Sequence, residues 1–276
     1  MQPRSFSGET LIRSIERRMS FISSSTFLRA LAAFLWNSMQ STDNLKALRR
    51  FAEKEILLGD VVITFNWDVG LERSLYMDRK EPSFHYFYSR KLAQKQVFLL
   101  KPHGSIDWFK KVDLPNRSGI VDHHPPESPP KRGVGSDYLQ LDKKICVFKY
   151  FDFTEHPKLV KLQSVIVPPV SSKEFKHRAL QRTWISVFRA VSQATELHVI
   201  GYSLPREDQF ARLVLRRAIR NNLLNVEKGK KPALSLRVVN SDEAVWTTFS
   251  RLVGGSGALA KIEFQQGLSQ DYIATL

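Results

Sequence analysis

Short apolar runs alternate with helical patterns over most of the chain beyond residue 58. Five of these runs are continuous, which is typical of strands covered on both faces of a parallel sheet. They are VVITF (61–65), VFLLK (97–101), SVIVP (164–168), LHVIG (197–201) and LSLRVV (234–239). Helical spacing predicts helices at about 69–77, 173–192 and 205–224. The residues expected to face inward on the second helix are Leu180, Trp184, Val187, Phe188 and Val191. Those on the third helix are Phe210, Leu213, Val214 and Ala218. The alternation predicts an α/β fold with a doubly wound, mainly parallel, Rossmann-like sheet.

Two segments depart from this rhythm. Residues 1–58 show only helical spacing, with a helix start signal at Ser41 to Asp43, and predict a helical segment packed on a core domain of residues 59–276. Residues of about 109–162 are interrupted by DHHPPESPPKRGVGSD and predict an insertion that carries a small subdomain. His123 and His124 lie in this Pro-rich loop without a ligand partner at useful spacing, so no metal site is expected there.

The composition narrows the class of protein. Cys146 is the single cysteine, which excludes an internal disulfide and a multi-cysteine zinc site and fits a reducing cytoplasm. The longest apolar helical stretch, FLRALAAFLW, contains Arg29 and is too short to cross a bilayer, and the N-terminus lacks a secretion signal. The net charge of +15 favours a polyanionic partner such as nucleic acid, a nucleotide or an acidic protein, and it fits a basic surface without a partner equally well.

Polar residues follow four of the predicted strands, and the carboxyl ends of parallel strands are where open sheets bind ligands. The four clusters are Asn66-Trp67-Asp68, His103-Gly104-Ser105, Gly201-Tyr202-Ser203 and Asn240-Ser241-Asp242. Each has a structural alternative: Asp68 can cap a helix, Asn66 can be a turn residue, and His103 can be a structural histidine. Gly104 permits a ligand to approach closely beside His103. Their joint placement predicts a site at one edge of the sheet.

These motifs resemble the sirtuin-like NAD-binding family. Thr64-Phe65-Asn66-Trp67-Asp68 resembles its Thr-x-Asn-x-Asp motif, and Lys101 to Ser105 resembles its His-Gly-Ser motif. Gly201-Tyr202-Ser203 and Asn240 match two later elements. The stretch IGYSLPREDQFARLVLRRAI is especially similar to the bacterial branch found in anti-phage defence proteins, some of which work beside short Argonautes. The resemblance covers roughly residues 55 to 265.

The resemblance implies specific roles. Asn66 and Asp68 would line the nicotinamide-ribose pocket together with Thr64, and His103 would act as a base near the ribose hydroxyls, beside Gly104 and Ser105. The adenosine side of NAD would be held by Gly201, Tyr202, Ser203, Asn240 and Asp242. Two departures stand out: the family's opening Gly-Ala-Gly loop is absent, and so are the four zinc-ligand cysteines. The second departure argues against a protein deacylase and against bound zinc.

Two functions follow as hypotheses. The first is hydrolysis of NAD to ADP-ribose and nicotinamide, as an effector in anti-phage defence, in a homo-oligomer or with a defence-system partner protein. The second is a sirtuin-like module without catalysis that binds a nucleotide or docks on a nucleic-acid-guided partner, as the charge and the missing glycine loop suggest.

Overall fold

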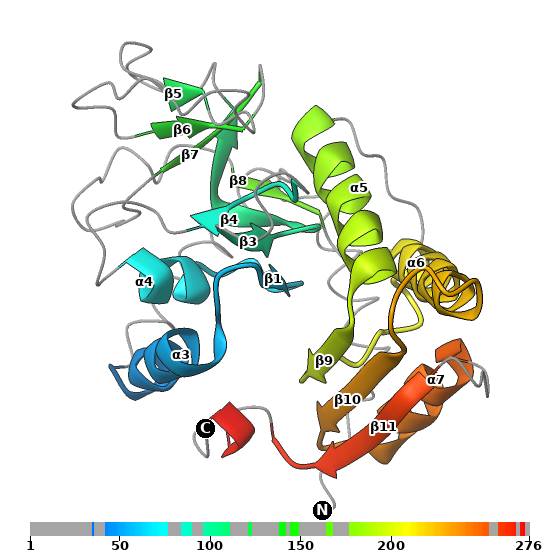
Figure 1. Cartoon of the computed structure of the whole chain (residues 1–276). Coiled ribbons are helices and arrows are strands. Elements are labelled where there is room, and N and C mark those ends of the chain that lie inside the picture. Colours follow the sequence, from blue (N-terminus) through cyan, green and yellow to red (C-terminus); the bar gives the residue numbers. More distant parts are fainter. Residues whose placement is uncertain are drawn as a thin grey trace, which may run out of the picture.

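The fold is α/β: small parallel sheets alternate with helices, and an antiparallel sheet is attached to them (Figure 1). The computed structural model describes residues 35, 42–76, 84–89, 96–110, 121–122, 138–141, 144–148, 164–167, 177–253, 259–268 and 271–273. Most of the predicted N-terminal helical segment, the His123–His124 pair and the greater part of the predicted insertion lie outside these residues. Among the described residues, no helix is long and apolar enough to span a membrane.

The first parallel sheet has the order β1-β3-β2, formed by Val61–Ile63, Val97–Leu100 and Phe84–His85. β3 is buried along its whole length, as its unbroken apolar sequence predicts. Helix α3 (Thr42–Glu55) packs against helix α4 (Gly70–Tyr76), which directly follows β1. The sequence predictions of a helix start near Ser41 and of a short helix after Asp68 are both confirmed.

The second parallel sheet has the order β11-β10-β9. Its strands are Glu196–Ile200 (β9), Leu234–Asn240 (β10) and Leu259–Gln266 (β11), and they alternate with α6 (Gln209–Glu227) and α7 (Glu243–Val253). Helix α5 (Arg178–Gln193) precedes β9 and packs on α6 (Figure 1). Residues 259–266 lacked a strand prediction, because polar side chains interrupt the apolar run.

One face of this second sheet is polar. Glu196 and His198 of β9 are exposed, while Arg237 of β10 pairs with Glu263 of β11 at 2.8 Å on the same face. The prediction that LHVI and LSLRVV are covered on both faces is therefore wrong for this face. The apolar side chains of the alternate positions, including Val199, are buried against α5, α6 and α7 and account for the continuous hydrophobic reading.

The remaining strands form a five-stranded sheet of order β5-β6-β7-β4-β8, called the antiparallel sheet here because every pair except the parallel β5–β6 pair is antiparallel. The strands are Val121–Asp122 (β5), Tyr138–Gln140 (β6), Ile145–Phe148 (β7), Gly104–Lys110 (β4) and Ser164–Ile166 (β8). SVIV is thus a strand, as predicted, but it pairs antiparallel with β4 and lies outside both parallel sheets. The chain turns from β3 into β4 within three residues, Lys101 to His103, so the cluster predicted as a strand-end loop is a tight junction between two sheets.

Helix α6 begins at Gln209, four residues after the predicted start at Pro205. Asp208 is its N-cap, and the Asp208 carboxylate accepts a hydrogen bond from the Ala211 amide at 3.1 Å. Leu204 just before it has a left-handed backbone, with φ of 52°. The predicted inward faces are right for most residues and wrong for Leu213 and Phe188, which are 51% and 37% exposed.

The parallel sheets share one hydrophobic core. It contains Phe98 and Leu100 of the first sheet together with Val199, Leu236 and Val238 of the second. Trp184 and Val187 of α5 lie in the same core. A second core joins the first sheet to the antiparallel sheet through residues such as Leu99 and Trp108. β3 therefore contributes to both cores, and its carboxyl end lies where all three sheets approach one another.

Candidate functional site

The centre of the candidate site is a buried pair of His103 and Asp208. The His103 Nε2 atom lies 2.8 Å from the Asp208 Oδ2 atom, and the two side chains are only 3% and 0% exposed. His103 follows β3, whereas Asp208 caps α6 beyond β9, so the two parallel sheets meet through this contact. A carboxylate beside one ring nitrogen fixes the orientation of an imidazole, as an acid–base residue requires.

Aromatic rings surround this pair. Phe65, at the end of the β1 segment, meets the His103 ring edge-on at 5.2 Å and stacks flat on Tyr202 at 3.9 Å. Trp184 of α5 lies 6.0 Å from the His103 ring, and Phe210 of α6 packs on Trp184. Burial first, and then the negative charge of Asp208, raises the pKa of the Tyr202 hydroxyl, so this hydroxyl stays protonated. The rings give His103 an environment of low polarity.

The segment after β1 combines exposed and anchored residues. The Asn66 side chain is exposed, and the backbone N–H of Asn66 donates to the Thr64 hydroxyl at 3.2 Å. The Asp68 carboxylate accepts a hydrogen bond from the Gly70 amide at 2.9 Å at the start of α4, so its structural alternative as a helix cap is confirmed. The Trp67 carbonyl accepts from the Ile106 amide at 2.9 Å. The segment is therefore held by its backbone, which leaves Asn66 open to solvent.

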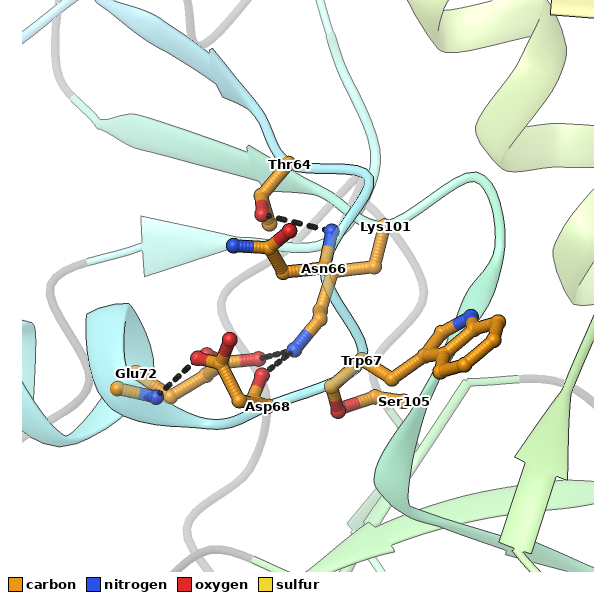
Figure 2. A network of polar contacts seen from close by, with 8 residues as sticks. Thr64, Asn66, Trp67, Asp68, Glu72, Lys101 and Ser105 are labelled. Atoms are coloured by element: carbon orange, nitrogen blue, oxygen red, sulfur yellow. Dashed lines mark hydrogen bonds and ion pairs between the residues drawn. The ribbon is translucent and has the colours of Figure 1, made fainter. Parts of the chain in front are cut away.

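A buried lysine lies beneath this segment. Figure 2 shows the Lys101 side chain extending to the Asp68 carbonyl and the Glu72 carboxylate, while the Trp67 indole points away from the ammonium. The Lys101 Nζ atom lies 2.7 Å from Glu72 Oε1, with side-chain exposures of 0% and 5%. Asp107 of β4 is also buried, and the positive charge of Lys101 acts on both carboxyl groups. The cluster fixes the position of the carbonyl of Asp68.

Burial dominates the protonation of both carboxyl groups. It raises the pKa of Glu72 to about 7, and although Lys101 lowers the value, the nearby Asp107 raises it further. The pKa of Asp107 is likewise raised by burial, against the opposing effects of Lys101 and of a hydrogen bond with Ser105. Two buried carboxyl groups that face a single cation cannot both ionise without a large cost, so the cluster retains a proton into the neutral range.

The junction beside His103 has no space for a larger residue at position 104. Gly104 has a positive φ of 77°, and a Cβ atom there would lie 2.0 Å from the Val165 carbonyl oxygen. The close approach is thus made by the backbone of β8, whereas the sequence predicted approach by a ligand. The Ser105 hydroxyl donates to the Trp67 carbonyl at 3.2 Å and is fully buried. Ser105 therefore joins the β1 segment to β4.

The residues predicted for the adenosine side of NAD lie at the ends of β9 and β10. Gly201 donates its amide to the Val239 carbonyl at 2.9 Å, next to Asn240, and Ser203 is exposed. The Asn240 side chain accepts from the Asp242 amide at 3.0 Å, and the Asp242 side chain accepts from Ala244 at 2.9 Å at the start of α7. Ser203 and Asp242 are exposed, whereas Asn240, the last residue of β10, is buried.

Three of the four predicted clusters are connected by direct contacts: Phe65, which precedes Asn66, contacts His103 and Tyr202, and the Ser105 hydroxyl donates to the Trp67 carbonyl. Asn240 lies beside Gly201 at the same edge of the second sheet. Sequence reasoning missed the Asp208 partner of His103, because Asp208 reads as a residue of the first helical turn. It also missed the Lys101 cluster. The signal for the latter was a lysine that directly continues an apolar run.

No metal site was found: the described part of the chain contains no group of three or more His, Cys, Asp or Glu side chains that could hold a metal ion. No family model matches the chain. Searches of curated proteins and of solved structures gave no match either.

Proposed function

We propose that this chain is a sirtuin-like protein with a Rossmann-type sheet that binds NAD and hydrolyses it to ADP-ribose and nicotinamide. The observation that carries the proposal is the His103–Asp208 pair, which joins the carboxyl end of β3 to the start of α6 among aromatic side chains. It supports the motif resemblance, because the residue matched to the family's base has an anionic partner suited to acid–base work. The β1-β3 and β9-β10 strand ends, with their polar residues, support a nucleotide site at this edge.

The proposed chemistry breaks the bond between the nicotinamide nitrogen and C1′ of the ribose. The electron pair of that bond leaves with nicotinamide, water adds to C1′, and one proton is released. The charge that develops at C1′ resembles an oxocarbenium ion, which a shielded site with placed polar groups stabilises. His103 would accept a ribose hydroxyl proton, and the Asp208 carboxylate would stabilise the imidazolium formed. Asn66 would contact the nicotinamide-ribose from the exposed end of β1.

The experiment follows nicotinamide release from NAD by the wild-type protein, His103→Ala and His198→Ala. His198 is a matched control, because it is 45% exposed on the polar face of β9 and away from the pair. We expect His103→Ala to lower the rate by about 10²–10⁴, the usual contribution of general acid–base catalysis, and His198→Ala to leave it unchanged. Equal rates for the three proteins would reject His103 as the base, and absence of release by wild type would reject the hydrolase.

A second candidate function is nucleotide binding without turnover. It is favoured by the burial of His103, which is 3% exposed, so that NAD reaches the imidazole only if surrounding side chains move. Calorimetric titration with NAD separates the two: binding without nicotinamide release, weakened in Asn66→Ala and Ser203→Ala, would support the binding module. If NAD hydrolysis is observed, depletion of cellular NAD on phage infection would test the proposed role in anti-phage defence.

A further inference from the structure

Tyr202 lies beside the His103–Asp208 pair, although the sequence resemblance assigned it to the adenosine side of NAD. Its ring stacks on Phe65 at 3.9 Å with an angle of 3° between the two planes, and Phe65 in turn meets the His103 ring edge-on. The ring is therefore held between the segment after β1 and the loop that leads from β9 to α6. Stacking accounts for the position of the ring and leaves the role of the hydroxyl open.

The loop from β9 to α6 is anchored at several points. Leu204 is buried with a left-handed backbone, at a φ of 52°, and the Arg212 side chain donates to the Leu204 carbonyl at 2.8 Å. The Asp208 amide donates to the Pro205 carbonyl at 3.1 Å, which closes a turn just before α6. Tyr202 and Asp208 lie near the two ends of this loop, so the anchors fix where the two side chains lie relative to each other.

The Tyr202 hydroxyl is buried close to the Asp208 carboxylate. Burial raises the pKa of this hydroxyl, and the charge of Asp208 and a weak hydrogen bond to it raise the pKa further, while the charge of Arg212 lowers it. The bond is longer or more bent than a standard one, because the hydroxyl has no partner of standard geometry among the described residues. A buried hydroxyl that stays protonated is stabilised when it donates to a carboxylate, which is a strong acceptor.

We propose that the Tyr202 hydroxyl donates to the Asp208 carboxylate and so positions this carboxylate against His103. Tyr202 is then a positioning residue, which acts on the reaction through Asp208 and not by contact with NAD. A carboxylate held by a helix amide, a hydroxyl and an imidazole has little freedom to rotate, so the imidazole keeps the orientation that a base requires. The effect of Tyr202 on the reaction rests on the proposed hydrolysis of NAD, whereas its effect on His103 does not.

The first test measures nicotinamide release by wild type, Tyr202→Phe and Tyr88→Phe over a range of NAD concentrations. Phenylalanine at position 202 keeps the ring that stacks on Phe65 and removes only the hydroxyl. Tyr88 is a matched control, because it packs against the same core and its hydroxyl donates to Gln193 at 3.0 Å rather than to Asp208. We expect Tyr202→Phe to lower kcat about tenfold with KM unchanged, as the loss of one hydrogen bond to a charged group does, and Tyr88→Phe to match wild type.

The second test combines Tyr202→Phe with Asp208→Asn. The double variant should release nicotinamide as slowly as Asp208→Asn alone, because the carboxylate that Tyr202 positions is already gone. A role of Tyr202 in packing or in binding adenosine would instead add its own loss to that of Asp208→Asn. Additive losses, an unchanged kcat in Tyr202→Phe, or a rise in KM alone would therefore overturn the proposal.

A third measurement involves no NAD and stands apart from the test of the hydrolase. NMR spectra of isotope-labelled histidine rings are compared between wild type, Tyr202→Phe and Tyr88→Phe, and the His103 signals are identified by their loss in His103→Ala. We expect only Tyr202→Phe to shift the His103 signals, and neither variant to shift those of His198, which is exposed on β9. If wild type releases no nicotinamide, this measurement alone decides: shifted His103 signals support the contact with Asp208, and unshifted signals overturn it.

Discussion

The buried Lys101 cluster predicts how the stability of the protein depends on pH. Glu72 has a pKa of about 7 in the folded protein, against 4.5 for the free carboxyl group, because burial disfavours its charged form. Between these two values the folded state binds more protons than the unfolded state. The free energy of unfolding therefore falls as the pH rises through this window.

The size of the effect follows from the pKa difference. Each pKa unit corresponds to about 1.4 kcal/mol, so the shift of Glu72 amounts to about 3 kcal/mol lost between pH 4 and pH 8. In Glu72→Gln the amide has nearly the same shape and cannot ionise, while Lys101 keeps Asp107 as its counter-charge. We expect this variant to lose most of that pH dependence and to be at least as stable as wild type at pH 8.

Removing the Lys101 ammonium should lower the stability of the protein at high pH, whereas removing the Glu72 carboxyl should not. Lys101→Met leaves Glu72 and Asp107 buried without a counter-charge, which typically costs about 3–5 kcal/mol when both are ionised. Lowering the pH to 5 protonates the carboxyl groups, so the loss should shrink. Lys101→Met should therefore become more stable on acidification, relative to wild type, whereas Glu72→Gln should not.

The assay is urea unfolding followed by tryptophan fluorescence at pH 5, 6, 7 and 8 and constant ionic strength. Glu53→Gln and Lys261→Met serve as matched controls, because both remove one member of a surface ion pair, and each should change stability by less than about 1 kcal/mol at every pH. If Glu72→Gln retains the pH dependence of wild type, the Glu72 carboxyl is not the group that titrates. If Lys101→Met is equally destabilised at pH 5 and pH 8, the charge argument is wrong and the loss reflects packing.

Three further changes test the junction and its surroundings. Gly104→Ala should be far more destabilising than Gly229→Ala in thermal unfolding. Both glycines have a positive φ, but only at position 104 would the added Cβ atom clash with backbone atoms. Equal losses of stability would contradict this geometry. Asp208→Asn keeps a side chain able to cap α6 but removes the charge beside His103. Nicotinamide release should therefore fall about 10²–10⁴-fold while the circular dichroism spectrum stays unchanged, and an unaltered rate would show that Asp208 does not position His103. Asn222→Leu should cost about 2–4 kcal/mol in urea unfolding, because its amide donates to two carbonyls at the end of α5; a loss below 1 kcal/mol would show that water replaces those bonds.

The sequence predicted all five continuous apolar strands: β3 and β8 are buried along their whole length, and β9 and β10 carry enough apolar residues to read as continuous runs although one of their faces is polar. It did not predict β4, whose Gly104 and Ser105 read as a loop and whose Asp107 interrupts the apolar pattern. It did not predict β11 either, because Lys261, Glu263 and Gln265 lie on the polar face of a sheet that was expected to be covered on both sides. In both cases pairing with a neighbouring strand, which no local pattern reveals, determines the structure.

The site shows the same limit at the level of single residues. Strand ends could be located from the apolar runs, which is why His103 and Asn66 were selected as candidates. The partner of His103 could not be located, because the local sequence gives Asp208 a sufficient role as a helix cap, and it performs that role as well. Likewise, the burial of Lys101 depends on Glu72 and Asp107, which come from a helix and from an unpredicted strand.

His103 is fixed from two sides, and this links the site to the assembly of the fold. Its backbone carbonyl accepts a hydrogen bond from the Val167 amide at 2.8 Å, beside the antiparallel sheet, while its imidazole contacts Asp208 at the start of α6. One residue therefore connects the antiparallel sheet to the second parallel sheet. The Asp208 carboxylate caps α6 with its Oδ1 atom and contacts the imidazole with its Oδ2 atom, so movement of α6 would alter the orientation of the ring.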